Sequence, residues 1–296
     1  MADYELTYPG GALPLDAVDG TEMPAGLAIG SLLGTTGRTT FDPGYGNTAS
    51  CKSAITFIDG DAGILRYRGY PIDQLAKSST FLETAYLLIY GELPSATELD
   101  NFSDRIAKHT LLHEDLKGFF NGFRHDAHPM AVLNSAVSAL GTFYQDSLDP
   151  FDPEHVEVST IRLLAKVPTI AAYAYKKAAG QPFLYPDNSL GYVENFLRMT
   201  FGVPAETYDV NPALARALDM LFILHSDHEQ NCSTSPVRLV GSANANMFTS
   251  IAAGIGALSG PLHGAANQAV IEMLADIAAD GGNVQAFVDR VKNKEP

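Results

Sequence analysis

The sequence predicts a mainly α-helical protein with a short β-hairpin region near its N-terminus. Two Ser/Thr-x-x-Glu motifs, which begin at Thr80 and Ser95, are typical of capping boxes at the starts of helices. Gly91 follows the first of these helices and Pro94 lies just beyond it, a combination typical of a helix end. From about residue 72 onward, apolar helical stretches alternate with short loops, without a repeat of fixed period or a low-complexity linker.

The first sixty or so residues differ from the rest of the chain. In SAITFIDGDAGILRYRGYPI, two β-rich runs flank Asp59-Gly60-Asp61, which predicts a β-hairpin. Gly44-Tyr45-Gly46 resembles the start of a dinucleotide-binding fingerprint. That fingerprint needs a helix after it, and here a strand follows, so we reject this interpretation.

The later helices are expected in a series. The stretch STIRLLAKVPTIAAYAYKKAAG is helical in composition but contains Pro168, which predicts a kink or a break. Asn211 followed by Pro212 predicts an N-cap with proline at the first helical position. Further helices are expected in SANANMFTSIAAGIGALSG, AANQAVIEMLADIAADGG and NVQAFVDRVKNK.

Composition excludes several classes of protein. The chain has 296 residues, of which 46% are hydrophobic, so it can form one large domain or two modest ones with a real core. A formal net charge of −15 argues against nucleic-acid and anionic-membrane partners. Two cysteines, Cys51 and Cys232, cannot form a disulfide framework and fit a reducing compartment. The start MADYELTYPGG lacks the features of a secretory signal and no run is long enough to span a bilayer, so we expect a cytoplasmic protein.

The helix that begins at Asn211 is expected to extend through two histidines. His225 and His228 continue an apolar stripe at helical spacing, whose earlier members are Leu214, Leu218 and Leu221. Two core histidines with satisfied hydrogen bonds are the simplest interpretation. The motif HSDHEQN, however, carries more polar groups than the end of a core helix normally does.

Two functional interpretations of this motif remain open beside the structural one. His225 and His228 could share a metal ion with Asp227 or Glu229. On a helix Asp227 would project away from both histidines, and the pattern is not His-Glu-x-x-His, so we disfavour a metal. Alternatively, His228 could donate hydrogen bonds to an anionic substrate in a cleft.

His263 has the stronger case for a chemical role, because Gly260-Pro261 and Gly264 frame it in LSGPLHGAANQ. A helix is expected to begin near Ala265, with its N–H groups and positive dipole end directed toward this loop. There the charged imidazole is disfavoured, and a neutral N–H donor can polarise a carbonyl, as enolisation requires. A buried turn histidine without a chemical role is the alternative that these features leave open.

The remaining histidines lie in polar helical or loop stretches. We expect them to be surface or capping residues: His109, His113, His125, His128 and His155. No Ser or Cys lies in a nucleophile-elbow pattern, and the chain contains no P-loop.

Several longer motifs resemble citrate synthase of the bacterial kind over essentially the whole chain. They are LHSDHEQNCSTSPVRLVGS and GPLHGAANQAV, preceded by HPMAVL, FYQDSLDP and GQPFLYPDN. The resemblance implies a mostly helical enzyme with a large and a small domain that works as a homodimer or a multiple of it. It also implies an acyltransferase of the tricarboxylic acid cycle. This enzyme condenses acetyl-CoA with oxaloacetate to citryl-CoA and hydrolyses the thioester, without a metal or other cofactor.

The resemblance also implies roles for four residues. His263 matches the histidine that hydrogen-bonds the acetyl carbonyl and stabilises its enol or enolate. His228, the second histidine of HSDHE, matches an oxaloacetate-binding residue, and His225 and Asn231 match supporting neighbours in substrate binding. In this family a further histidine, the aspartate base and the carboxylate-binding arginines are expected beyond Pro296, so we expect the 296-residue chain to be inactive alone.

The resemblance divides the chain into three segments. Residues 1–70 would form the N-terminal segment with the hairpin, 71–264 the helical large domain, and 265–296 the first helices of the small domain. We expect apolar surface to be exposed on this last segment. Two alternatives remain: a 2-methylcitrate synthase that uses propionyl-CoA, or a non-catalytic dimerisation or binding module of the same fold.

Overall fold

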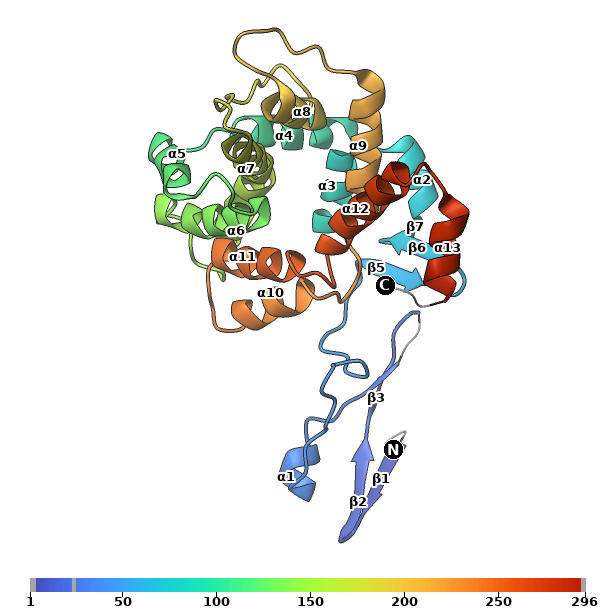
Figure 1. The fold of residues 1–296 in the computed structure, drawn as a ribbon. Coiled ribbons are helices and arrows are strands. Elements are labelled where there is room, and N and C mark those ends of the chain that lie inside the picture. Colours follow the sequence, from blue (N-terminus) through green and yellow to red (C-terminus); the bar gives the residue numbers. More distant parts are fainter. Residues whose placement is uncertain (1–3, 23–24, 294–296) are drawn as a thin grey trace. The chain divides into compact units, whose positions relative to one another are not determined.

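The computed structural model describes residues 4–22 and 25–293 and is mainly helical, which confirms the predicted fold class (Figure 1). It divides into two compact units, residues 1–72 and 73–296. The first unit contains short strands and one short helix, and the second contains the long helices.

The first unit is built from short antiparallel strand pairs. The hairpin predicted around residues 59–61 is confirmed, because β5 (Thr56–Asp59) pairs with β6 (Ile64–Tyr67), which in turn pairs with β7 (Tyr70–Pro71). A second hairpin, which the sequence analysis did not predict, joins β1 (Tyr4–Tyr8) to β2 (Gly11–Leu15). The remaining elements of this unit are β3 (Ala17–Val18), β4 (Gly26–Leu27) and α1 (Leu32–Thr36).

The second unit is a series of helices joined by loops. Those before the candidate site are α2 (Ile72–Ser78), α3 (Phe81–Tyr90), α4 (Ala96–Ala107), α5 (Glu114–Phe119), α6 (Pro129–Leu140), α7 (Pro153–Ala179) and α8 (Tyr192–Phe201). Those that form or follow it are α9 (Pro212–Leu224), α10 (Thr234–Gly241), α11 (Met247–Leu258), α12 (Ala265–Ala279) and α13 (Val284–Lys292). Short 3-10 turns follow α5 and α6, at Phe120–Gly122 and Gly141–Phe143.

The predicted helix signals are present. Both capping boxes form, at Thr80 with Glu83 and at Ser95 with Glu98. Gly91 ends α3 in the left-handed conformation at φ +99°, which glycine adopts without a Cβ penalty. Two of the histidines expected to be surface or capping residues, His113 and His128, accept hydrogen bonds at the N-termini of α5 and α6.

The main core of the second unit lies where α6, α7 and α11 pack together. Its buried side chains include Phe120, Val137, Tyr173 and Phe248. In Figure 1, α6 and α11 run side by side, and α10 lies next to α11. This packing fixes the helices that lead into the candidate site.

Pro168 does not break α7, which continues from Pro153 to Ala179. Proline lacks an N–H, so the carbonyl of Leu164 loses the partner it would have within the helix. The hydroxyl of Tyr192, at the start of α8, donates a hydrogen bond to this carbonyl at 2.9 Å. An interhelical bond therefore replaces the missing one. Of the two outcomes predicted at Pro168, a kink or a break, the break is wrong.

Lys166 is a buried cation on the same helix, with 3% of its surface exposed. Its Nζ donates to the carbonyls of His109 and Leu111, which are neutral acceptors. Burial, with a smaller contribution from the positive charge of Arg162, lowers the pKa of Lys166 to about 8.

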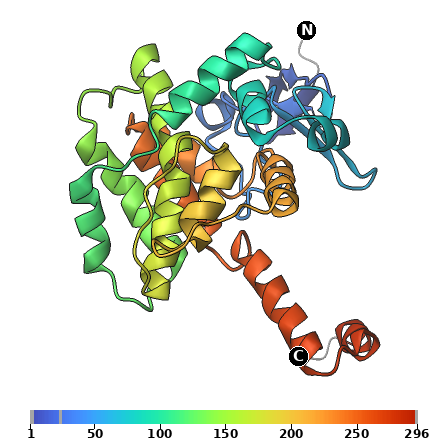
Figure 2. The same cartoon turned by 90° about the horizontal axis from the view of Figure 1, so that it is seen from above.

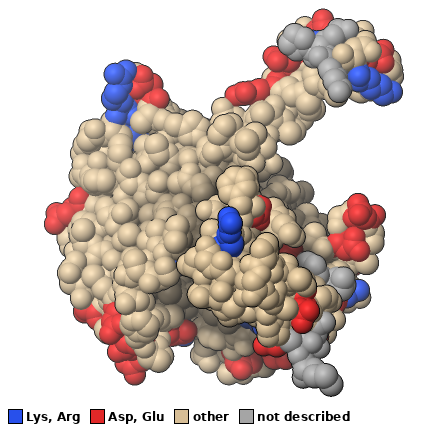
Figure 3. All heavy atoms as spheres, turned by 90° about the horizontal axis from the view of Figure 1, so that it is seen from below, with Lys and Arg blue, Asp and Glu red and all other residues tan. Residues whose placement is uncertain are grey.

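In Figure 2 the last two helices, drawn in red, extend away from the other helices of the second unit. They contribute no buried residue. Apolar side chains on them are exposed, as expected for this segment: Val270, Ile271, Leu274, Val284 and Val291. No described helix is long and apolar enough to cross a membrane. On the face drawn in Figure 3, the described Lys and Arg residues are scattered among Asp and Glu residues and form no basic patch.

Tyr192→Phe removes the hydroxyl that replaces the missing helix bond. We expect the free energy of unfolding to fall by about 1–2 kcal/mol, because the Leu164 carbonyl loses its donor. Urea unfolding measures this, with the exposed Tyr175→Phe as the control that should change little. In a Pro168→Ala background the carbonyl regains a backbone N–H, so Tyr192→Phe should cost less there. An equal cost in both backgrounds would contradict the explanation.

Lys166 makes stability depend on pH. Its folded pKa of about 8 lies below the ordinary 10.5. Between these values the unfolded chain binds more protons than the folded one, so this group makes the free energy of unfolding rise with pH, by about 3 kcal/mol over the window. Lys166→Met should flatten the rise seen by urea unfolding, whereas Lys77→Met, at a side chain that is 74% exposed, should not. Parallel pH curves for wild type and Lys166→Met would refute this.

Candidate active site

The two histidines of HSDHEQN do not extend helix α9, contrary to the sequence prediction. The helix ends at Leu224, and His225 is its C-cap. The Nδ1 of His225 donates to the carbonyl of Leu221 at 2.8 Å, and the hydroxyl of Ser226 donates to that of Phe222 at 2.7 Å. These side chains compete with the backbone for the last carbonyls and favour the end of the helix. The leucine stripe is not fully buried either, since Leu214 and Leu221 are 58% and 49% exposed.

His225 and His228 lie together in the turn after α9. Their ring centroids are 5.8 Å apart, and the Nε2 of His228 donates to the carbonyl of Leu224 at 3.1 Å. Both side chains are exposed. Asp227 accepts the backbone N–H of Glu229 at 2.9 Å. Within the described residues, no three His, Cys, Asp or Glu side chains are grouped to hold a metal ion.

Asn231 shapes the turn that leads into α10. Its carboxamide oxygen accepts the backbone N–H groups of Ser233 at 2.7 Å and of Thr234 at 3.0 Å. The hydroxyl of Thr234 in turn donates to the carbonyl of Glu229 at 3.1 Å. Asn231 therefore fixes the backbone between the two histidines and Ser233.

Ser233 is the residue that sequence reasoning missed. Its hydroxyl lies 2.9 Å from the carbonyl oxygen of Gly254 on α11 and 3.4 Å from the Nδ1 of His263. A Cβ on Gly254 would lie 2.7 Å from a methyl group of Val237, so glycine allows α10 and α11 to approach this closely. Ser233 belongs to a quoted motif, but no local signal in the sequence shows which distant atoms it touches.

His263 lies half-buried in the turn between α11 and α12. Its backbone N–H donates to the carbonyl of Gly260 at 3.0 Å, and the N–H of Gly264 donates to that of Leu258 at 2.9 Å. A Cβ on Gly264 would lie 2.6 Å from this Leu258 oxygen. The glycine after the histidine is thus required by a close backbone approach, which explains the frame around His263.

Helix α12 begins at Ala265, as predicted. Its first N–H groups do not all face open space, because Ala265 donates to Gly260 at 3.3 Å and Ala266 donates to His263 at 3.0 Å. Among the predicted site residues and Ser233, the structure brings two pairs into contact: His225 with His228, and Ser233 with His263. Asn231 lies in the turn between them.

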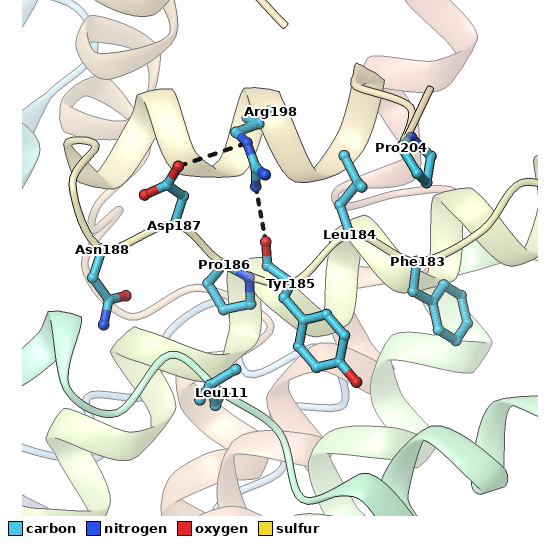
Figure 4. Close-up of a pocket in the computed structure, with 9 residues that line it drawn as sticks. All are labelled: Leu111, Phe183, Leu184, Tyr185, Pro186, Asp187, Asn188, Arg198 and Pro204. Atoms are coloured by element: carbon cyan, nitrogen blue, oxygen red, sulfur yellow. Dashed lines mark hydrogen bonds and ion pairs between the residues drawn. The ribbon is translucent and has the colours of Figure 1, made fainter. Parts of the chain in front are cut away.

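A separate pocket of about 490 Å³ contains none of the predicted site residues (Figure 4). Arg198 of α8 lines it, donates to the carbonyl of Tyr185 at 2.8 Å and lies 3.9 Å from a carboxylate oxygen of Asp187. Its other lining residues are Leu111, Phe183, Leu184, Pro186, Asn188 and Pro204. Six of the lining residues, 183–188, lie in the stretch GQPFLYPDN, in which no sequence pattern predicted a pocket.

Comparison with known proteins identifies the family. The family model described as citrate synthase, C-terminal domain, matches residues 44–296. Citrate synthase 1 of Mycobacterium tuberculosis is 67% identical over 299 residues, which cover 100% of this chain and 69% of the relative. Citrate synthase of Corynebacterium glutamicum is 58% identical over 291 residues, covering 98% of this chain and 67% of the relative.

Solved structures agree with this assignment. Citrate synthase from Pyrobaculum aerophilum has a TM-score of 0.73 at 32% identity, covering 94% of this chain and 63% of that one. Citrate synthase from Thermotoga maritima has a TM-score of 0.72 at 31% identity, covering 87% of this chain and 66% of that one. The chain thus spans 63% to 69% of the length of these relatives. It belongs to the citrate synthase family.

Proposed function

We propose that this chain forms the part of a citrate synthase that activates the acyl group. In the reaction, the methyl carbon of acetyl-CoA attacks the ketone of oxaloacetate to give citryl-CoA. Hydrolysis of the thioester then releases citrate and CoA. The observation that carries the proposal is the 67% identity over the whole chain, with His263 half-buried in the turn between α11 and α12.

His263 is proposed to donate a hydrogen bond to the acetyl carbonyl. When the methyl group loses a proton, negative charge develops on this oxygen, and a fixed donor stabilises that charge more than it stabilises the substrate. A neutral imidazole suits this role because it donates without transferring a full proton.

Ser233 is proposed to select the ring nitrogen that donates. A hydroxyl has one proton, and here it has two acceptors within reach, the Gly254 carbonyl and the Nδ1 of His263. If it donates to Gly254, a neutral His263 must carry its proton on Nδ1. If the hydroxyl turns to donate to Nδ1, the proton lies on Nε2, which can then face the substrate. We assign the second arrangement to the reacting complex.

The turn after α9 is proposed to bind oxaloacetate. The Nε2 of His228 donates to a backbone carbonyl, so a second donation, to a substrate carboxylate, would come from Nδ1. A ring that donates from both nitrogens is a cation, which suits a dianionic substrate. The exposed His225 ring beside it and the Asn231 carboxamide beneath the turn support secondary roles for these residues.

Several finer assignments accompany this proposal. We propose that the enzyme is a homodimer or a multiple of it and needs no metal or other cofactor. The exposed Leu239 on α10, at 72%, supports a protein contact on that helix. The chain has two cysteines, Cys51 and Cys232, too few for a disulfide framework, which supports a reducing, cytoplasmic location. The boundary between large and small domains is proposed after residue 264.

The acyl-CoA that the enzyme consumes distinguishes a citrate synthase from the two alternatives. A 2-methylcitrate synthase would release CoA faster from propionyl-CoA than from acetyl-CoA at equal concentration. A non-catalytic dimerisation or binding module would release it from neither.

The 296-residue chain alone is expected to have no measurable synthase activity. The chain spans about two thirds of its relatives, and we place the base and the carboxylate-binding arginines in the remaining third. Loss of a general base alone costs roughly 10² to 10⁴ in rate. CoA release from acetyl-CoA and oxaloacetate should be restored in a fused enzyme, in which this chain is joined to the last third of citrate synthase 1 of Mycobacterium tuberculosis. Wild-type-like turnover by the 296-residue chain would refute this, and an inactive fused enzyme would favour the module.

In the fused enzyme, His263→Ala should lower kcat by about 10²-fold or more while changing the Kd for oxaloacetate little. The reason is that His263 acts on charge that develops in the transition state. Steady-state kinetics and calorimetric titration with oxaloacetate measure the two effects. The comparison is His225→Ala, in the turn after α9. It should affect oxaloacetate binding more than His263→Ala does. Equal losses of turnover and binding in His263→Ala would indicate a structural role.

A further inference from the structure

A line of hydrogen bonds connects the N-terminus of α6 to α12. The Nδ1 of His128 accepts the backbone N–H of Met130 at 3.2 Å, as the N-cap of α6. Its Nε2 lies 3.2 Å from the carboxamide oxygen of Gln268. The carboxamide nitrogen of Gln268 donates to the carboxylate of Glu272 at 2.8 Å. Three side chains from two helices thus form one continuous line.

The direction of each bond in this line is fixed by its neighbours. A backbone N–H can only donate, so the Nδ1 of His128 must be the acceptor, and the proton of the neutral ring lies on Nε2. A carboxylate can only accept, so Gln268 presents its nitrogen to Glu272 and its oxygen to His128. Donor therefore meets acceptor at every step.

This line matters because, apart from the backbone hydrogen bonds of the preceding turn, no buried packing holds α12 in place. The helix buries none of its residues, so core packing does not fix its orientation. Gln268 lies in the first turn of α12. The contact of Ser233 with His263 is made in the turn just before this helix. A hydrogen bond between His128 and Gln268 therefore limits how the segment that carries His263 can rotate.

We propose that His128 is a positioning residue: through Gln268 it holds the first turns of α12 against the N-terminus of α6 and so keeps His263 beside Ser233. The chemical use of that position rests on the proposed function, but the positioning itself does not. His128 caps one helix and orients another with the two nitrogens of one ring.

Three variants of the 296-residue chain separate the effect of the His128–Gln268 hydrogen bond from the effect of His128 as the N-cap of α6. His128→Asn keeps a good N-cap but has too short a side chain to reach Gln268. Gln268→Leu keeps His128 and its cap and removes the carboxamide. The matched control is Gln285→Leu on α13, where the carboxamide donates to Asp289 at 2.9 Å within one helix.

Hydrogen exchange and imidazole NMR provide the readouts. His128→Asn and Gln268→Leu should each raise amide exchange in the first turns of α12 roughly two- to fivefold, the effect of one exposed neutral hydrogen bond. The double variant should exceed neither single variant, because both remove the same bond. Gln268→Leu should also shift the ring signals of His263, and Gln285→Leu should leave both readouts unchanged.

Three results would overturn the proposal. They are unchanged exchange in Gln268→Leu, additive effects in the double variant, and a wild-type His128 ring whose proton lies on Nδ1. Gln268 is exposed, so its variant keeps the test valid if His128→Asn fails to fold. None of these readouts needs turnover. A failure of the proposed positioning role of His128 is therefore distinguishable from an inactive fused enzyme.

Discussion

The candidate site depends on a close backbone approach between the end of α11 and the start of α12. Gly264 donates to the carbonyl of Leu258, and a Cβ at this position would lie 2.6 Å from that oxygen. Only glycine permits this contact without a shift of the backbone, so the turn that carries His263 requires glycine at position 264. Gly254 leaves room for the side chain of Val237, so that α10 and α11 approach closely and Ser233 lies beside His263.

Two buried polar groups on α7, the carbonyl of Leu164 and the ammonium of Lys166, are satisfied by other elements in a similar way. The carbonyl that Pro168 leaves without a helical partner accepts the Tyr192 hydroxyl, and the ammonium of Lys166 is held by loop carbonyls. Such groups are costly to bury without a partner. They tie α7 to α8 and to the loop before α5, and α7 in turn supports α6 and α11 at the core.

Local signals in the sequence predicted much of the fold, and distant contacts account for what they missed. Capping boxes at Thr80 and Ser95 and the N-cap at Asn211 are short-range features, and all three form. A kink or a break was predicted at Pro168, and the helix does not break there, since a tyrosine from another helix replaces the lost bond. The hairpin β1–β2 was missed, although Gly10 and Gly11, with φ of +119° and +156°, follow Pro9 in a turn-forming sequence.

In the candidate site, too, local features were predicted from the sequence and distant contacts were missed. The frame of His263 and the start of α12 were predicted from nearby residues, and both were found. The prediction that helix α9 continues through His225 and His228 is wrong, because periodicity does not show where polar side chains end a helix. Ser233 was missed because its partners lie 21 and 30 residues away in the chain.

The central claim is that His263 donates a hydrogen bond to the acyl carbonyl. Infrared difference spectra of ¹³C-labelled acetyl-CoA, bound to the fused enzyme with an unreactive oxaloacetate analogue, test it most directly. A hydrogen bond weakens the C=O bond, so the account predicts a lower stretching frequency than in water, and loss of that shift in His263→Ala. The same frequency in both proteins would contradict it.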